Sequence, residues 1–195
     1  MDFLIYSRAS SSVTEDRELD EEQLTEQHWT YMDGYADAMT ARGPLLAPDR
    51  DSWEGSLHIV DLPGPDAVRA FVADEPYQRA GLFGQHAIWR YVDLLGRTMW
   101  QFPDDADEPR FLVIARGRPG ASRTAVPVPL DDLPVELRRR LIVYGELRGL
   151  EDDVPAGVAL AVQAPTRAFL DDLLDDEAAS LGEVDVHDWE FGGRR

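Results

Sequence analysis

The sequence predicts an α+β fold made of two similar units in tandem, each with the element order β-α-β-β-α-β. Three observations support this prediction: an internal repeat, the alternation of β-rich and helical segments, and an acidic break between the two halves. A repeat of this kind indicates two copies of one structural unit. Identical residues stand 102 positions apart in four pairs: Gly43 and Gly145, Gly55 and Gly157, Asp74 and Asp176, Glu75 and Glu177. With a drift of two positions, Trp89 and Tyr91 match Trp189 and Phe191.

The first unit opens with a β-rich run over 3–7, and the polar segment 9–19 is typical of a loop. Asp20 and Gln23 have the spacing of a capping box, which predicts a helix that ends near Arg42. Residues at spacings of three and four share one face of this helix. They are Leu24, His28, Tyr31, Tyr35 and Ala38 or Met39.

The rest of the first unit follows from its turn and breaker residues. We expect strand 45–46, turn 48–51, strand 56–60, helix 65–75, loop 77–84 and strand 87–91. Pro76 should end the helix at Glu75, because a residue before proline disfavours helical geometry. This order is that of a ferredoxin-like unit, whose helices cover one face of the sheet. The other face needs a cover, which a second unit can provide.

The segment 103–109 is acidic and bounded by prolines, so we interpret it as a linker between a unit over 1–102 and a unit over 110–195. The second unit is expected to contain strands 111–115, 142–144, 158–163 and 184–191 and helices 135–141 and 166–180. Units of about 90 residues lie near the lower limit for an independent core. We therefore expect the two units to pack sheet against sheet as an intramolecular pseudo-dimer.

Composition excludes several classes of function. The formal net charge of −19 argues against a nucleic-acid partner, because phosphate binding depends on clustered cations. The chain has no cysteine, and all 19 cations are arginine, so thiol nucleophiles, disulfides and Schiff-base lysines are excluded. No secretory signal and no run of eighteen apolar residues is visible, so we expect no membrane partner and a cytoplasmic location.

Proton transfer must therefore come from histidine, carboxylate, hydroxyl or phenol groups. His28 stands on an otherwise apolar helix face, where a histidine is more often a satisfied buried side chain than a catalytic group. Tyrosines near it suit the core better than acid catalysis, because their ordinary pKa is near 10. His58 and His86 lack the spacing of a zinc site, and no phosphate-binding glycine motif appears. We expect no metal and no cofactor.

The first unit resembles the YCII-related (YciI-like) family over about residues 1–102. The resemblance rests on six motifs: Phe3-Leu4-Ile5-Tyr6, His28 with Tyr31, Gly43-Pro44-Leu45, the Gly55-led strand, Pro76-Tyr77 with Ala80-Gly81-Leu82-Phe83, and the string over 97–102. It implies a ferredoxin-like fold assembled as dimers that bury the open sheet faces, in the manner of dimeric α/β barrels. It also implies an active site around a histidine and an aspartate. Most members have no assigned reaction, and a dehydrochlorinase acting on a chlorinated aromatic ring is an informative exception.

The resemblance identifies His28 as the candidate general base. The family aspartate directly precedes proline, and that position is Glu75 here, with Asp74 one residue earlier, so both carboxylates stay open. A carboxylate fixes the imidazole tautomer and raises its basicity, and such acid–base catalysis is typically worth ~10²–10⁴-fold. Tyr31, Tyr77 and Arg79 are the substrate-binding candidates.

These residues predict a cofactor-independent lyase, isomerase or hydrolase that acts on a small molecule. The alternative is a non-catalytic ligand-binding or assembly module on the same scaffold. The second unit is a degenerate copy: it keeps Asp176 and Glu177 but has no counterpart of His28. We therefore expect one active site per chain, with the second unit as structural partner, and further homo-oligomerisation stays open.

Overall fold

The computed structural model describes residues 1–11, 20–105, 107–117, 127–181 and 183–192, with the side chains of 175–181 outside that description. The first half contains β1 (Asp2–Ala9), α1 (Glu21–Asp33), β2 (Met39–Leu46), β3 (Trp53–Asp61), α2 (Pro65–Asp74), α3 (Pro76–Arg79) and β4 (Phe83–Asp93). The second half contains β5 (Arg110–Arg116), α4 (Val135–Arg140), β6 (Leu141–Arg148), β7 (Pro155–Gln163), α5 (Arg167–Leu181) and β8 (Glu183–Trp189). Short 3₁₀ turns lie at Ala36–Ala38, Met99–Gln101 and Leu130–Asp132.

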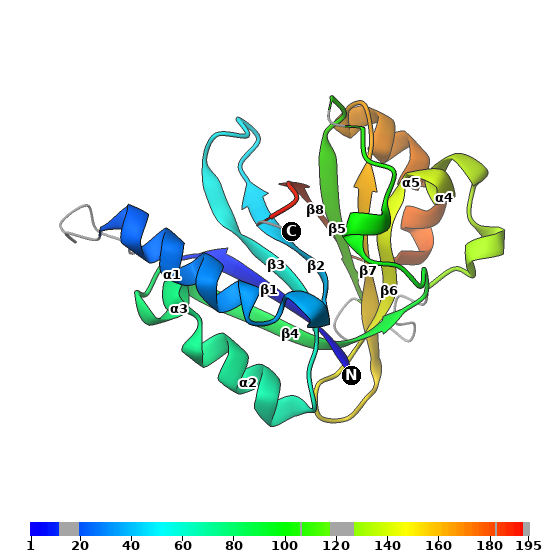
Figure 1. Ribbon diagram of the computed structural model, residues 1–195. Helices are drawn as coiled ribbons and strands as arrows, with labels where there is room; N and C mark the ends of the chain where they lie inside the picture. The colour runs from blue at the N-terminus through cyan, green and yellow to red at the C-terminus, as the bar shows by residue number, and fades with distance from the viewer. Residues whose placement is uncertain (12–19, 106, 118–126, 182, 193–195) are drawn as a thin grey trace.

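The eight strands form one closed antiparallel barrel in the order β1-β3-β2-β8-β5-β7-β6-β4. Two seams join the halves: β2 pairs with β8 at Leu45 and Trp189, and β4 pairs with β6 at Tyr91 and Leu147. Helices α1, α2 and α3 lie outside the strands of the first half, and α4 and α5 lie outside those of the second (Figure 1). The predicted α+β class with antiparallel strands is confirmed.

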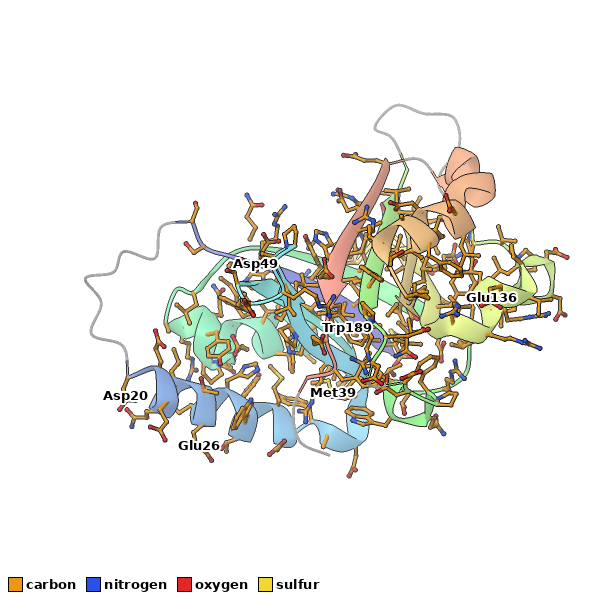
Figure 2. All side chains as sticks on the ribbon, turned by 90° about the horizontal axis from the view of Figure 1, so that it is seen from above. Asp20, Glu26, Met39, Asp49, Glu136 and Trp189 are labelled. Atoms are coloured by element: carbon orange, nitrogen blue, oxygen red, sulfur yellow. The ribbon has the colours of Figure 1, made fainter. Side chains whose placement is uncertain are left out.

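Alternate residues of each strand fill the barrel, because successive side chains of a strand point to opposite faces. The interior cluster includes Leu4, Leu57, Ile59, Leu112 and Trp189, all of them fully buried. Trp189 lies near the middle of the molecule between the two halves (Figure 2). Closing the barrel by edge pairing therefore covers the inner sheet faces and leaves no free edge at the seams.

The first helix is shorter than the sequence predicts. Asp20 caps it as expected, since its carboxylate accepts a hydrogen bond from the backbone N–H of Gln23 at 2.9 Å. The helix ends at Asp33 instead of near Arg42, and the residues from Met39 onward form strand β2. The helical spacing over 39–42 is overridden by tertiary pairing, because Met39, Ala41 and Arg42 pair with β3.

Other boundaries also differ from expectation. The expected loop 77–84 contains the short helix α3, which Pro76 starts after α2 has ended at Glu75 as predicted. The expected loop 9–19 falls largely outside the described residues. Within the described ranges, no helix is long and apolar enough to cross a lipid bilayer.

The strand register gives a physical reason for the repeat. Arg8 lies opposite Gly55, and Arg116 lies opposite Gly157. A Cβ atom at either glycine would lie about 2 Å from a carbonyl oxygen of the neighbouring strand, at 2.0 Å and 2.2 Å respectively, so only glycine fits. The same register corrects the match between Trp89 and Trp189. Leu4 and Leu112 occupy equivalent positions in the two halves; Leu4 pairs with Trp89, and Leu112 pairs with His187. His187, and not Trp189, is therefore the counterpart of Trp89.

Candidate active site

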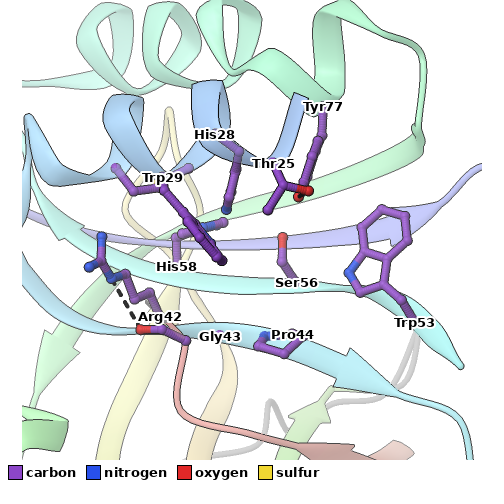
Figure 3. Close-up of a pocket in the computed structure, with 12 residues that line it drawn as sticks. Thr25, His28, Trp29, Arg42, Gly43, Pro44, Trp53, Ser56, His58 and Tyr77 are labelled. Atoms are coloured by element: carbon purple, nitrogen blue, oxygen red, sulfur yellow. Dashed lines mark hydrogen bonds between the residues drawn. The ribbon is translucent and has the colours of Figure 1, made fainter. Parts of the chain in front are cut away.

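A cavity of about 250 Å³ lies between α1 and the outer face of strands β2 and β3 (Figure 3). Thr25, His28 and Trp29 reach it from α1, and Ser56 and His58 reach it from β3. These β3 positions alternate with the barrel-filling residues, so their side chains face the helix instead of the barrel interior. The cavity therefore belongs mainly to the first half.

His28 contacts Glu75 inside this region. Nδ1 of His28 lies 2.7 Å from Oε1 of Glu75, and only 4% of the Glu75 side chain is exposed. The other oxygen of Glu75 accepts the backbone N–H of Gln78 at 2.7 Å, because Glu75 is the N-cap of α3. Each carboxylate oxygen of Glu75 thus has a hydrogen-bond partner. Because an ionised carboxylate can only accept hydrogen bonds, Nδ1 of His28 is the donor in this contact. Nε2 is then the ring nitrogen that is free to accept a proton.

Asp74 points away from this pair. It forms an ion pair with Arg79, and both side chains are more than half exposed, at 54% and 66%. Arg79 does not line the cavity. Of the two carboxylates considered from the sequence, Glu75 contacts His28, and the expected role of Arg79 in substrate binding has no support from its position. Proline explains the difference, because Pro76 forces Glu75 out of helical geometry and turns it toward α1.

Tyr77 lies beside the histidine. Its ring stacks on the imidazole of His28 with centroids 4.3 Å apart and an interplanar angle of 5°, and its hydroxyl donates to Oγ1 of Thr25 at 3.2 Å. The imidazole is therefore held by a hydrogen bond on one nitrogen and by a ring on one face. Tyr77 also lines the cavity, where the sequence analysis expected it.

Tyr31, in contrast, is half-buried and packs against the core. Its hydroxyl donates to the carbonyl oxygen of Phe71 at 2.9 Å, and its ring packs beside Tyr35 and Phe71. Burial, with a further contribution from Tyr35, raises the pKa of Tyr31 above its ordinary value. Tyr31 does not line the cavity, so the prediction that it binds substrate is not supported by its position.

His58 is a site residue that the sequence analysis did not select. Its ring centroid lies 6.2 Å from that of His28, and the residue is only 4% exposed. Burial, followed by the nearby positive charges of His28, Arg42 and His86, lowers the pKa of His58 to about 3. His58 is therefore neutral near pH 7. Its place two residues after Ser56 in one strand was the available signal, because residues i and i+2 share a face.

Three further groups complete the cavity. The hydroxyl of Ser56 is buried and has no hydrogen-bond partner in the described part of the chain, so it can bond to a ligand. Trp53 adds an aromatic wall at one end. At the other end, the side chain of Arg42 is 3% exposed, and its Nε donates to the carbonyl oxygen of Gly192 at 3.2 Å. The end of the second half thus contributes to the wall of the cavity in the first.

We expect the stability that His58 contributes to depend on pH. Its folded pKa of about 3 lies below the ordinary value of 6.5, so between these values the unfolded chain binds more protons. Protonation therefore destabilises the folded protein as the pH falls. Relative to His58→Asn, the wild-type protein should lose about 1.4 kcal/mol of unfolding free energy per pH unit in this window. Urea denaturation of both proteins at pH 6, 5 and 4 measures this, and a constant difference would contradict it.

Comparisons with known proteins address the fold and the family. The family model described as the YCII-related domain matches residues 1–92. Among solved structures, the chain is similar to 5-chloro-2-hydroxyhydroquinone dehydrochlorinase from Burkholderia phenoliruptrix AC1100 in complex with 2,5-dihydroxybenzoquinone. Identity is 26%, the TM-score is 0.40, and the match covers 47% of this chain and 94% of the other. No match to a curated protein was found.

Two other structures match along nearly the whole chain. A candidate chlorite dismutase is 8% identical with a TM-score of 0.56, and the match covers 97% of this chain and 94% of the other. A candidate monooxygenase from Lactobacillus acidophilus NCFM is 7% identical with a TM-score of 0.49, and the match covers 97% and 92%. The first of these shows that the chain shares its antiparallel α+β fold with that structure.

The family match covers the part of the chain that carries the site. It includes the helix with His28, the turn with Glu75 and Tyr77, and the strand with His58. Residues 1–92 of the chain therefore form a YCII-related domain.

Proposed function

We propose that the first half of the chain is a small-molecule enzyme, a cofactor-independent lyase, isomerase or hydrolase, with His28 as its general base and Glu75 as the residue that orients it. The observation that carries the proposal is the 2.7 Å contact between Nδ1 of His28 and Oε1 of Glu75 beside a cavity. The match to the YCII-related domain is consistent with it.

The chemistry follows from the free nitrogen of His28. Nε2 accepts a proton from a weakly acidic C–H or O–H group of the substrate, or from a water molecule. The imidazolium that forms is stabilised by the carboxylate of Glu75, in a charge-assisted hydrogen bond within a largely buried site. The same proton then returns to another atom of the substrate or leaves with the departing group. Elimination, isomerisation and hydrolysis all use this cycle.

The surrounding groups suit the binding of a small partly polar molecule. The hydroxyl of Ser56 and the neutral imidazole of His58 can each form a hydrogen bond with substrate, and Arg42 places a cation at one end of the cavity. Tyr77 acts as a positioning residue, because it contacts the base. Asp74, Tyr31 and Arg79 have no part in this proposal.

A non-catalytic ligand-binding or assembly module is the competing function. The cavity and the unpartnered Ser56 hydroxyl would serve such a module equally well. The contact between His28 and Glu75 favours the enzyme, because a binding module has no need of a buried carboxylate that orients a histidine.

We also propose that residues 1–102 and 110–195 act as tandem ferredoxin-like units, joined by the linker 103–109, in an intramolecular pseudo-dimer. The strand orders β4-β1-β3-β2 and β8-β5-β7-β6 are equivalent, which supports this division. The second unit would serve as structural partner, because its first helix α4 has no histidine. The side chains of Asp176 and Glu177 lie outside the described residues.

A thermal-shift screen with a panel of metabolites tests the function. A ligand at ~100 times its dissociation constant adds roughly 2.7 kcal/mol to the stability of the folded protein. Each stabilising compound is then incubated with the protein, and its consumption is followed by mass spectrometry. A compound consumed only when His28 is present supports the enzyme. A compound that binds and stays unchanged supports the module, and consumption without any need for His28 contradicts the proposed mechanism.

A further inference from the structure

A second cavity, of about 160 Å³, lies at the end of the barrel where β1 and β5 finish. Both halves of the chain line it, with Tyr6 and Arg8 from β1, Trp89 from β4, Arg116 from β5 and Asp185 from β8. These positions share the strand faces that fill the barrel, since Leu4 on β1 and Ile114 on β5 belong to the interior cluster. The cavity is therefore separate from the one between α1 and β3.

The two arginines occupy equivalent positions in the two halves. Arg8 lies opposite Gly55 on β3, and Arg116 lies opposite Gly157 on β7. Because β1 and β5 stand on opposite sides of the barrel, the repeat brings two guanidinium groups to one opening. Both groups are accessible from solvent at this opening, since Arg8 is exposed and the side chain of Arg116 is 41% exposed.

The arginines have unused hydrogen-bond donors. Among the described residues, Arg8 is exposed and forms no ion pair, so its donors face solvent at the opening. Arg116 uses one terminal nitrogen in an ion pair with Asp185, and its Nε is buried without an acceptor. An unsatisfied buried donor is unfavourable, so a ligand oxygen at this point would gain binding energy. Guanidinium groups match the geometry of carboxylates, to which they can donate two parallel hydrogen bonds.

The rest of the cavity suits an apolar body. Trp89 and Ile114 provide apolar surface, and the hydroxyl of Tyr6 lies 3.1 Å from Nε2 of His187. The volume is close to that of an engineered cavity of about 150 Å³ that holds one benzene ring. Two carboxylates oppose a bound anion, namely Asp185 in the lining and Glu54, whose charge influences both Tyr6 and His187.

We propose that this barrel-end cavity binds a small carboxylate with a flat apolar body, the size of a single-ring acid. Arg8 and Arg116 hold the carboxylate, and the ring lies against Trp89. The proposal is independent of the proposed function, because it uses neither His28 nor the cavity beside it. Asp185 competes with the ligand for Arg116, so the site is tuned by a carboxylate of the protein itself.

Isothermal titration calorimetry with benzoate tests the site, with neutral benzamide as the matched probe that lacks the charge. We expect wild-type protein to prefer benzoate. Arg8→Gln and Arg116→Gln should each weaken benzoate binding by about tenfold, since each removes a charged hydrogen bond. Asp185→Asn should strengthen it, because the substitution frees Arg116. Arg69→Gln, which removes the same charge from the outside of α2, and His28→Gln should leave the affinity unchanged.

Three results would overturn the proposal. The first is that wild-type protein does not bind benzoate at millimolar concentration, and the second is that the double variant Arg8→Gln and Arg116→Gln binds benzoate with unchanged affinity. The third is that His28→Gln loses benzoate binding, because this loss would place benzoate in the cavity beside His28. Circular dichroism and thermal melting of each variant show whether the barrel has folded. If the double variant does not fold, the Asp185→Asn protein provides the test. Its affinity for benzoate should be higher than that of wild-type protein, and an unchanged or lower affinity would overturn the proposal.

Discussion

Replacing His28 by glutamine is expected to lower the turnover number by ~10²–10⁴-fold, the usual contribution of a general base. Glutamine can still donate a hydrogen bond to Glu75 from its amide nitrogen, but it has no nitrogen that accepts a proton. The side chain of His28 is 15% exposed and lies at a cavity wall, so the barrel should stay folded. Steady-state kinetics on a compound from the thermal-shift screen measure the loss, and urea denaturation measures the stability.

Neighbouring carboxylates provide matched controls for this experiment. Glu75→Gln should lower turnover less than the histidine change does, because the base remains but its orientation is poorer. Asp74→Asn should leave turnover nearly unchanged, since Asp74 pairs with Arg79 on the surface. The double change Asp176→Ala with Glu177→Ala in the second half should also have little effect. Full turnover in the His28→Gln protein, or a loss in the Asp74→Asn protein, would exclude the proposed roles.

A fragment of residues 1–102 is expected to aggregate or to form homodimers instead of folding as a monomer. Removal of the second half unpairs β2 and β4 at the two seams and takes away Leu112, Ile114 and Trp189 from the barrel interior. The apolar inner face of the remaining sheet would then be exposed to water, and such patches drive association. Two copies of the fragment could cover each other as the two halves do in the intact chain.

Size-exclusion chromatography with light scattering gives the oligomeric state of the fragment, and circular dichroism gives its secondary structure. Co-expression with a fragment of residues 110–195 serves as the control, because the two pieces should form a one-to-one complex that restores the barrel. Gly192 would return with the second piece, and with it the hydrogen bond to Arg42 at the cavity. A soluble, monomeric and fully active fragment of residues 1–102 would show that the second half is neither cover nor partner.

Local signals explain which parts of the fold could be predicted. Asp20 caps α1, and Pro76 separates α2 from α3, because capping and proline effects act over a few residues. The end of α1 could not be predicted in the same way. Residues 39–42 carry a helical spacing, and they become strand because they pair with β3 and because the carbonyl oxygen of Arg42 accepts the backbone N–H of Gly192.

The residues of the candidate site also fall into two groups, those that the sequence could suggest and those that it could not. The motifs around His28 and the Asp74-Glu75-Pro76-Tyr77 string suggested a candidate base, two candidate carboxylates and one aromatic neighbour, since these residues belong to motifs that can be recognised in one dimension. Ser56, His58 and Arg42 carry no such motif. They join the cavity because strands β2 and β3 present one face to α1.

By itself, the sequence determined the class of the fold, the resemblance of about residues 1–102 to the YCII-related family and the choice of His28 as the candidate base, because repeats, caps and motifs are local patterns. Only the tertiary structure decided that Glu75 and not Asp74 contacts His28, that Tyr31 packs against the core, and that Arg8 and Arg116 meet at one barrel opening. These facts depend on strand register and edge pairing between segments far apart in the chain. No local pattern encodes such pairing, because its free energy arises only when the distant strands come together.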